Sequence, residues 1–447
     1  MRIRSNGEEI HLSYCTNVHP GERWEAHFAE LRTHVPAVRE RLLGEGAPGG
    51  AARDGRFGIG LRLSAQALTD LEAPGAFARF AHWLDAERCY VHTVNGFPFG
   101  AFHGEPVKAA VYRPDWSEPA RLDYTCRLAT LLARLRPPES FGTISTLPGT
   151  FKAWADPARE RAIVENLLRA VAHCAVLERD AGVRIALAVE PEPCCLLETG
   201  AETVAFFEKR LLSMDGVHRL AGLTGRSAPE ARQILRRHLG VCHDVCHSAV
   251  EFESPRETLE RYAASGIGVH KLQLSSALRV PNVNEAAIRR LSRFDEPVYL
   301  HQVVERRGET LVRFADLGAA SDAMRYRLER RSTLDVRQRL PLPQPHDRLG
   351  APRAVAGSNA ALAWQAVEEP PIEWRVHFHV PVFMAEAGMF LTTQDTLAEV
   401  LALQRESGLS RHLEVETYTW GVLPANLGDV PPDLAIAREL DWVRKRL

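Results

Sequence analysis

Several apolar stretches of this sequence carry carboxylates, histidines or a lysine at or near their ends. The side chains concerned are, in chain order, Glu190, Glu192, Asp244, His247, His270, Lys271, Glu414 and Glu416. Carboxylate oxygens and imidazole nitrogens together suit Mn²⁺, Zn²⁺, Mg²⁺ or Co²⁺, with coordination positions left for water and substrate. The sequence therefore predicts a divalent metal site with Glu190, Asp244, His270 and Glu416 as ligands.

Taken singly, each of these residues has a plainer interpretation, because a polar residue at the end of an apolar run is commonly a hydrogen-bonded loop residue. Two observations favour a metal-binding or catalytic role for these residues over a purely structural one. Pro191 and Pro193 follow Glu190 and Glu192, and proline excludes helix from the residue before it, which suits carboxylates held in a fixed direction. The four predicted ligands also come from consecutive strand segments. Of the last two glutamates, Glu416 lies nearer the carboxyl end of its strand.

Eight β-rich runs alternate with amphipathic helical segments. The runs cover residues 10–15, 57–64, 89–97, 141–148, 183–191, 239–245, 268–275 and 412–420. Strand and helix repeated eight times predict an α/β fold of the (β/α)₈ TIM barrel class, in which active sites lie at the carboxyl ends of the strands. An open doubly wound sheet is the alternative, but no GxGxxG follows the first strand and the sequence has no phosphate-loop motif.

The chain is longer than a minimal barrel of about 250 residues, and most of the surplus falls between the seventh and eighth runs. We expect residues 1–447 to form one barrel domain and residues 280–375 to form an insertion over the barrel mouth. Residues 297–317 are typical of a hairpin. A proline- and alanine-rich stretch follows, and we expect residues 340–360 to be mobile.

Further polar residues at strand ends predict a small-molecule pocket. The predicted substrate-binding side chains are His19, His92, Asn95, Glu192, His247, Lys271 and Arg279. Packing on the barrel rim explains the neighbouring Phe97 and Phe99 equally well, and arginine is so frequent in this chain that Arg279 is the weakest of the set. His301 is more simply a residue of the inserted hairpin.

The composition narrows the class of protein. With 55 basic and 57 acidic residues the net charge is −2, which provides no general attraction to nucleic acid or to an anionic membrane. The first residues lack the apolar core of a signal peptide, and no apolar run is long enough to span a bilayer, so we expect a cytoplasmic protein. Eight cysteines without a CxxC pair predict neither a disulfide framework nor a thiolate zinc site.

Four motifs resemble the xylose isomerase-like barrels, a superfamily that includes sugar isomerases and epimerases, inosose dehydratases and endonuclease IV-type enzymes. They are VEPEP at 189–193, HDVCH at 243–247, VHKLQLSSALR at 269–279 and VETYTW at 415–420. The resemblance implies that Glu190, Asp244, His270 and Glu416 hold a divalent ion and that His247 lines the site. HFHVP at 377–381 is similar to the Asp-x-His motif of the endonuclease IV-type members, which implies a further metal-binding role for His377 and His379.

The whole chain also resembles the EboE proteins, encoded in bacterial ebo clusters and implicated as a group in metabolite traffic. The motifs are HLSYCTNVHPGE, TVNGFPFGAFHGEPVK, HDVCHSAVEFE and WRVHFHVPVF. The resemblance implies a pathway context, with other proteins of such a cluster as potential partners. It does not supply a reaction.

Three functions remain open at this point. The first is a metal-dependent isomerase or epimerase of the sugar phosphate type, acting on a small polyhydroxylated or hydroxy-keto metabolite, in which Glu190 and Glu416 move a proton. The second is a metallohydrolase, such as a phosphoesterase, with two or three ions and His247, His377 and His379 among the ligands. The third is a non-catalytic protein that binds and transfers a metabolite. We favour the first, with one ion and no organic cofactor; the sequence leaves the oligomeric state open.

Overall fold

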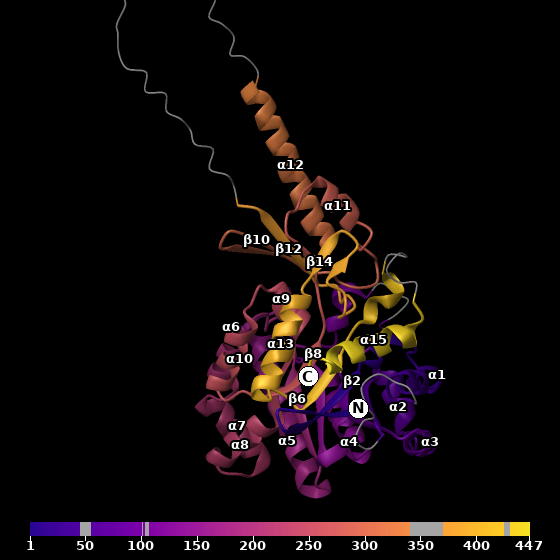
Figure 1. Ribbon diagram of the computed structural model, residues 1–447. Coiled ribbons are helices and arrows are strands. Elements are labelled where there is room, and N and C mark those ends of the chain that lie inside the picture. The colour runs from indigo at the N-terminus through magenta and orange to yellow at the C-terminus, as the bar shows by residue number, and fades with distance from the viewer. Residues whose placement is uncertain (45–54, 101, 103–106, 340–369, 424–429) are drawn as a thin grey trace, which may run out of the picture.

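The computed structural model describes residues 1–44, 55–100, 102, 107–339, 370–423 and 430–447 (Figure 1). Eight parallel strands form the barrel: β2 (Glu8–Tyr14), β3 (Phe57–Arg62), β4 (Cys89–Asn95), β5 (Phe141–Thr146), β6 (Arg184–Val189), β7 (Leu239–Asp244), β8 (Val269–Leu274) and β15 (His412–Val415). They pair in the order β2-β15-β8-β7-β6-β5-β4-β3, and a parallel bridge between Cys15 and Gly60 joins the two ends of the sheet. The predicted TIM barrel is confirmed, and β1 (Arg2–Ser5) adds an antiparallel strand to β2.

Helices surround this barrel (Figure 1). They are α1 (Trp24–Leu43), α2 (Ala65–Glu72), α3 (Pro74–Ala86), α4 (Pro119–Arg134), α5 (Pro157–Ala181), α6 (Gly200–Phe206), α7 (Met214–Thr224), α8 (Ala228–His238), α9 (Val245–Val250), α10 (Pro255–Ala264), α13 (Gln394–Ser407) and α15 (Pro432–Arg444). Each buries an apolar face, as Leu31, Val35 and Val38 do on α1. Local signals set helix starts: Asp156 accepts hydrogen bonds from the N–H groups of Ala158 and Arg159 at the start of α5. No helix among the described residues is long and apolar enough to cross a membrane.

A second sheet lies above the barrel in Figure 1, between β8 and β15 in the sequence. Its strands are β9 (Leu278–Val280), β10 (Val303–Arg307), β11 (Thr310–Phe314), β12 (Ile372–Val376), β13 (Glu386–Ala387) and β14 (Phe390–Thr392), paired antiparallel in the order β11-β10-β12-β9-β14-β13. The helices α11 (Glu285–Leu291) and α12 (Leu317–Arg339) belong to the same part of the chain. Its apolar core is separate from that of the barrel and includes Trp374 and Phe378.

The insertion between the seventh and eighth barrel strands is therefore present, but its sheet extends beyond the predicted range 280–375. It begins at Leu278 and continues to Thr392, because β14 pairs with β9 and keeps the chain after β12 in the same sheet. The predicted mobile stretch 340–360 lies outside the described residues.

The barrel interior contains a buried ion pair. Lys271 Nζ lies 3.0 Å from Glu414 Oε2, and neither side chain is exposed to solvent. Glycine at position 60 makes room for it, since a Cβ there would lie 2.4 Å from Glu414 Oε2. Glu414 lies on β15 and Glu416 directly follows its last residue, Val415. The two side chains project to the same side, with Glu414 inside the barrel and Glu416 at its mouth.

A buried carboxyl group joins the last helix to the barrel mouth. Glu439 on α15 accepts hydrogen bonds from the Thr417 hydroxyl (2.6 Å) and the Val382 N–H (3.1 Å). Burial raises the pKa of Glu439 to about 7, against the hydrogen bonds that favour its ionised form. Between pH 4.5 and 7, Glu439 is therefore largely protonated in the folded protein and largely ionised in the unfolded chain.

We expect Glu439→Gln to remove a pH-dependent loss of stability. The contribution of the protonated carboxyl is complete below pH 4.5 and is lost as the pH rises to about 7, since ionisation of a buried group is unfavourable. Relative to the variant, the wild-type free energy of unfolding should fall by about 2–3 kcal/mol between pH 5 and pH 8. Urea unfolding at the two pH values measures this difference. An identical pH dependence in both proteins would contradict it.

Candidate metal centre and active site

A pocket opens at the carboxyl ends of the barrel strands, beneath the second sheet. It encloses about 570 Å³, part of it open to solvent. Its polar lining consists of Asn17, Asn95, Lys108, Glu190, Glu192, His247, His377, His379 and Glu416. Its apolar and aromatic lining consists of Phe97, Pro98, Phe102, Val107, Val111, Tyr112, Tyr299, Leu300 and Tyr418. Pockets that combine apolar and aromatic side chains with convergent polar groups are typical of small-molecule sites.

Three histidines in this pocket each use one ring nitrogen to hold a fixed orientation. His247 Nδ1 lies 3.0 Å from the Pro191 carbonyl, His379 Nδ1 lies 2.9 Å from the Glu416 carbonyl, and His377 Nδ1 lies 2.7 Å from Gln302 Oε1. These oxygens only accept hydrogen bonds, so each Nδ1 must carry the proton. In the neutral rings, Nε2 is then an unprotonated lone-pair donor, which is the form that binds metal ions.

The three Nε2 atoms converge with Asp244. His247 Nε2 lies 3.2 Å from His377 Nε2 and 3.9 Å from Asp244 Oδ1, and His379 Nε2 lies 4.0 Å from Asp244 Oδ2. Asp244 Oδ2 and His379 Nε2 are buried and have no hydrogen-bond partner among the described residues. Buried polar atoms without partners are unfavourable and rare. A proton or a cation between Asp244 Oδ2 and His379 Nε2 would satisfy both atoms.

The sequence around Asp244 explains how this cluster forms. Asp244 ends β7 and caps α9, where its Oδ1 accepts the His247 N–H at 2.9 Å and the Ser275 hydroxyl at 2.8 Å. His247 is therefore placed in the first turn of the helix that Asp244 starts. Burial opposes ionisation of Asp244, but its histidine neighbours and these hydrogen bonds outweigh burial and lower its pKa. The pKa of His377 falls well below its usual value, chiefly through burial and then through the nearby His247 and His379.

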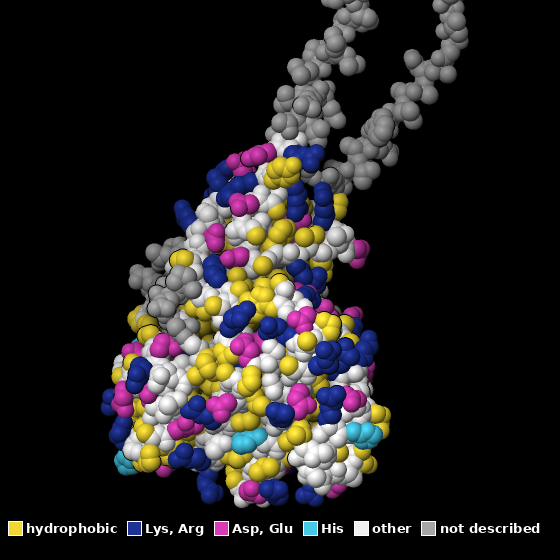
Figure 2. All heavy atoms as spheres, turned by 180° about the vertical axis from the view of Figure 1, so that it is seen from behind, with side chains coloured by type: hydrophobic (Ala, Val, Ile, Leu, Met, Phe, Trp, Pro, Cys, Tyr) yellow, Lys and Arg dark blue, Asp and Glu magenta, His cyan; other side chains and the backbone are white. Residues whose placement is uncertain are grey.

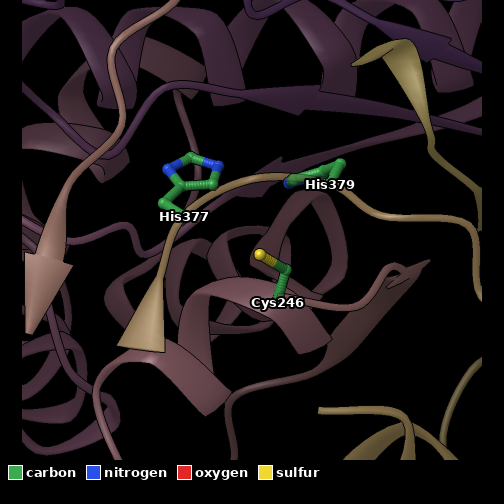
Figure 3. A group of neighbouring side chains, drawn as sticks. All are labelled: Cys246, His377 and His379. Carbon is green, nitrogen blue, oxygen red and sulfur yellow. The ribbon is translucent and has the colours of Figure 1, made fainter. Parts of the chain in front are cut away.

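Figure 3 shows His377 and His379 on the extended segment after β12, with Cys246 on α9 directed toward that segment. The potential ligand atoms of these three residues lie within 4.8 Å of one another, as do those of two overlapping groups, Asp244–His247–His379 and Glu192–His247–His377. Burial, followed by the charge of Asp244, raises the pKa of the Cys246 thiol well above its usual value. The imidazole and carboxylate donors therefore make the better ligand set, and a nitrogen-rich set of this kind suits Zn²⁺, Co²⁺ or Mn²⁺ more than Mg²⁺.

Two carboxylates flank the histidine cluster in different surroundings. Glu416 Oε1 accepts hydrogen bonds from the side-chain amides of Asn17 (2.6 Å) and Asn95 (2.9 Å). Glu190 follows β6, and its Oε2 has no hydrogen-bond partner among the described residues. Burial raises the pKa of Glu190 well above its usual value, with the charges of Glu416 and Asp244 adding to the effect. Two carboxylates with such different environments can play different acid–base roles.

His270 is not part of this cluster, although the sequence predicts it as a metal ligand. It is the second residue of β8, so it lies at the amino end of the barrel, against Gly240 and Gly268. Gly240 precedes Asp244 by four residues, or roughly 13 Å of strand. Burial, followed by the nearby charges of Arg184 and His238, lowers the pKa of His270 to about 3. Two of the three imidazoles of the cluster, those of His377 and His379, come from the segment after β12.

Four residues predicted to bind substrate also lie outside the pocket lining. His19 contacts the Tyr14 hydroxyl at 3.0 Å and stacks on His34, and His92 lies inside the barrel near His11 and His412. Lys271 is paired with Glu414 in the barrel interior, and Arg279 on β9 pairs with Glu373 of the second sheet. Alternation along strands and the antiparallel register of the insertion direct these side chains elsewhere.

Asn95, Glu192 and His247 do line the pocket as predicted. Sequence reasoning missed other contributors, among them Gln302, Tyr112, Ser275 and the aromatic pair Tyr299 and Tyr418. The rings of Tyr299 and Tyr418 lie 4.9 Å apart, and both contact Phe102 at 5.2 Å. Neither aromatic content nor a lone glutamine marks such residues in a sequence. Ser275 had a detectable signal, because it directly follows β8 at the carboxyl end.

No protein-family model matches the chain, and no curated protein sequence matches it. Solved structures with a similar fold include a xylose isomerase-like TIM barrel protein from Mycobacterium smegmatis in complex with magnesium (12% identity, 73% of this chain and 98% of that one, TM-score 0.39). Others are 3-keto-D-glucoside 4-epimerase from E. coli (12%, 59% and 79%, 0.32) and an AP endonuclease of family 2 from Brucella melitensis (15%, 59% and 78%, 0.32). At these identities and scores the likeness concerns the barrel fold alone, and the strand order described above is what establishes that fold.

Proposed function

We propose that this protein is a metal-dependent enzyme of the sugar isomerase or epimerase type that acts on a small polyhydroxylated or hydroxy-keto metabolite. The observation that carries the proposal is the convergence of the Nε2 atoms of His247, His377 and His379 on Asp244, beside Glu190 and Glu416. Asp244 Oδ2 and His379 Nε2 have no hydrogen-bond partner among the described residues. A divalent ion held there would stabilise negative charge that develops on substrate oxygens.

Glu190 and Glu416 supply the acid–base chemistry in this proposal. Isomerisation and epimerisation both require removal of a proton from carbon and its return to a neighbouring atom or to the opposite face. Glu190, with its raised pKa, is suited to hold and release that proton. The two amide hydrogen bonds from Asn17 and Asn95 hold Glu416 in a fixed direction at the other side of the cluster.

The charge of the pocket favours a substrate without a phosphate group. Among the lining residues that the structure describes, Lys108 is the one lysine or arginine. Its Nζ lies 2.8 Å from Asp316 Oδ2 and 3.2 Å from the Glu296 carbonyl, so its charge is already paired. The net charge of −2 adds no general attraction for anions, and Figure 2 shows basic and acidic side chains intermixed over the face seen from behind. The aromatic walls suit the apolar faces of an uncharged sugar.

Exchange of substrate hydrogen with solvent tests this function. Wild-type protein loaded with Zn²⁺, Co²⁺ or Mn²⁺ is incubated in D₂O with a panel of pentoses, hexoses and their ketoses, each beside its phosphate ester, and followed by ¹H NMR. We expect exchange at a carbon next to a carbonyl in an unphosphorylated member. Glu190→Gln and Glu416→Gln should each slow it by about 10²–10⁴-fold, because each removes an acid–base group.

Glu253→Gln is the matched control, since Glu253 is a carboxyl group with a raised pKa that accepts the Gly200 N–H outside this pocket. It should leave the exchange rate unchanged. Exchange that persists in both active-site variants, or that is lost equally in the control, would contradict the assigned roles. No exchange of any panel member by the metal-loaded wild type would count against the isomerase function.

A metallohydrolase is the second candidate, and one observation favours it. The groups Asp244–His247–His379 and Glu192–His247–His377 overlap at His247, an arrangement that also suits a two-ion centre. Two ions per chain by elemental analysis, together with hydrolysis of p-nitrophenyl phosphate, would support this function. One ion per chain with no hydrolysis would exclude it.

The relation to the EboE proteins and their metabolite traffic belongs to the same proposal and is supported by the four sequence motifs. It includes the non-catalytic alternative, in which the pocket binds and transfers an intermediate. Tight binding of a panel compound without exchange or turnover would favour that alternative.

A further inference from the structure

Gln302 immediately precedes β10 and is fully buried between the second sheet and the barrel mouth. Its Oε1 lies 2.7 Å from His377 Nδ1. Its Nε2 donates to the Tyr112 hydroxyl oxygen (2.7 Å), to Glu192 Oε1 (3.1 Å) and to the Pro193 carbonyl (3.2 Å). Every polar atom of this amide therefore has a partner.

The amide can take only one orientation. Rotation by 180° would place the amide oxygen against two acceptors, the Pro193 carbonyl and Glu192 Oε1. These contacts between oxygens would be repulsive in a buried site. The Tyr112 hydroxyl, which donates to Glu192 Oε1 at 2.6 Å, completes a network that fixes the amide.

The orientation of the Gln302 amide fixes the tautomer of His377. Since Gln302 Oε1 only accepts, His377 must carry its proton on Nδ1 and present the Nε2 lone pair to His247 Nε2, 3.2 Å away. The backbone reinforces this position, because the His377 N–H donates to the Gln302 carbonyl at 2.8 Å. Partners of this kind orient metal-binding imidazoles and increase their basicity.

We propose that Gln302 is a positioning residue for the metal centre, acting through His377, and that the inserted sheet is thereby a structural part of the centre. This inference rests on the proposed metal-dependent function. The insertion contributes two imidazoles, His377 and His379. It also contributes the buried Gln302 amide, which fixes the tautomer of His377. A barrel without β10 and β12 would retain Asp244 and His247 but lack these groups.

Metal affinity of the purified full-length protein tests the inference without reference to activity. Zn²⁺ and Co²⁺ dissociation constants are measured by competition with a chromophoric chelator for the wild type, Gln302→Met and Gln404→Met. Gln404 is the matched control, because it is also fully buried and makes two hydrogen bonds, to the Ser410 N–H and carbonyl, on α13 away from the pocket. We expect Gln302→Met to weaken binding by about 10–100-fold and Gln404→Met to change it by less than about threefold.

Two further variants show that the effect passes through His377. In a His377→Ala background, Gln302→Met should cause no additional loss of affinity. Gln302→Glu, whose protonated carboxyl keeps an acceptor for His377 Nδ1 and a donor toward Glu192 Oε1, should bind the ion more tightly than Gln302→Met, and it serves as the test if the methionine variant does not fold. A Gln302→Met affinity within threefold of the wild type, or an equal loss in Gln404→Met, would overturn the inference. A wild-type protein that binds neither ion would instead overturn the proposed function.

Discussion

Replacing His379 with glutamine should release the divalent ion from the protein, whereas the same change at His270 should leave it bound. His379 presents an unpaired Nε2 to Asp244 Oδ2, 4.0 Å away, in the pocket. His270 lies at the amino end of β8, beside Gly240, which is four residues before Asp244 on β7. Loss of one imidazole from a three-histidine set removes much of the binding free energy, since metal–ligand bonds act together in a fixed geometry.

The measurement is elemental analysis of each protein after loading with Zn²⁺ or Co²⁺ and removal of unbound ion. Wild type and His270→Gln should retain about one ion per chain, the number we expect for a single centre, and His379→Gln should retain less than about a tenth of that. Circular dichroism spectra of the three proteins control for folding. An ion lost from His270→Gln and kept by His379→Gln would reverse the assignment and restore the interpretation from sequence.

Lys271→Met should destabilise the fold by about 3–5 kcal/mol, because it leaves Glu414 as an unpaired charge in the barrel interior. Burial raises the pKa of Glu414 while the charge of Lys271 lowers it, so the lysine is the main group that favours the ionised carboxylate. Removing both partners should be much less costly, since a buried ion pair contributes little net stability over an uncharged pair of similar volume.

Urea unfolding of the wild type, Lys271→Met, Glu414→Gln and the double variant measures this coupling as a double-mutant cycle. The double variant should recover most of the stability that Lys271→Met loses. Additive effects of the two single changes would show that the pair is not coupled. Because Lys271 lies below the pocket and not in its lining, Lys271→Met should also bind the metal ion with the affinity of the wild type.

The sequence alone determined the barrel and part of its site. Alternation of apolar residues along strands and helical spacing between them are local properties, so all eight barrel strands were predictable from the chain. Residues at or just after the end of a parallel strand lie at one end of the barrel, which places Glu190, Asp244 and Glu416 together there, with Glu190 and Glu416 in the pocket lining. The same rule, applied strictly, excludes His270, because that residue starts its strand and does not end it.

Only the tertiary structure decided which imidazoles and amides join those carboxylates. His377, His379 and Gln302 belong to an insertion whose antiparallel register with β9 and β10 depends on contacts between residues far apart in the sequence. A shift of one residue in such a register would turn each side chain to the opposite face. The direction of Lys271 into the barrel likewise depends on Glu414, 143 positions later (414 − 271), and on the space left by Gly60. Local sequence patterns specify the strands. The direction of each polar side chain depends on the residues that it contacts across the barrel and in the insertion.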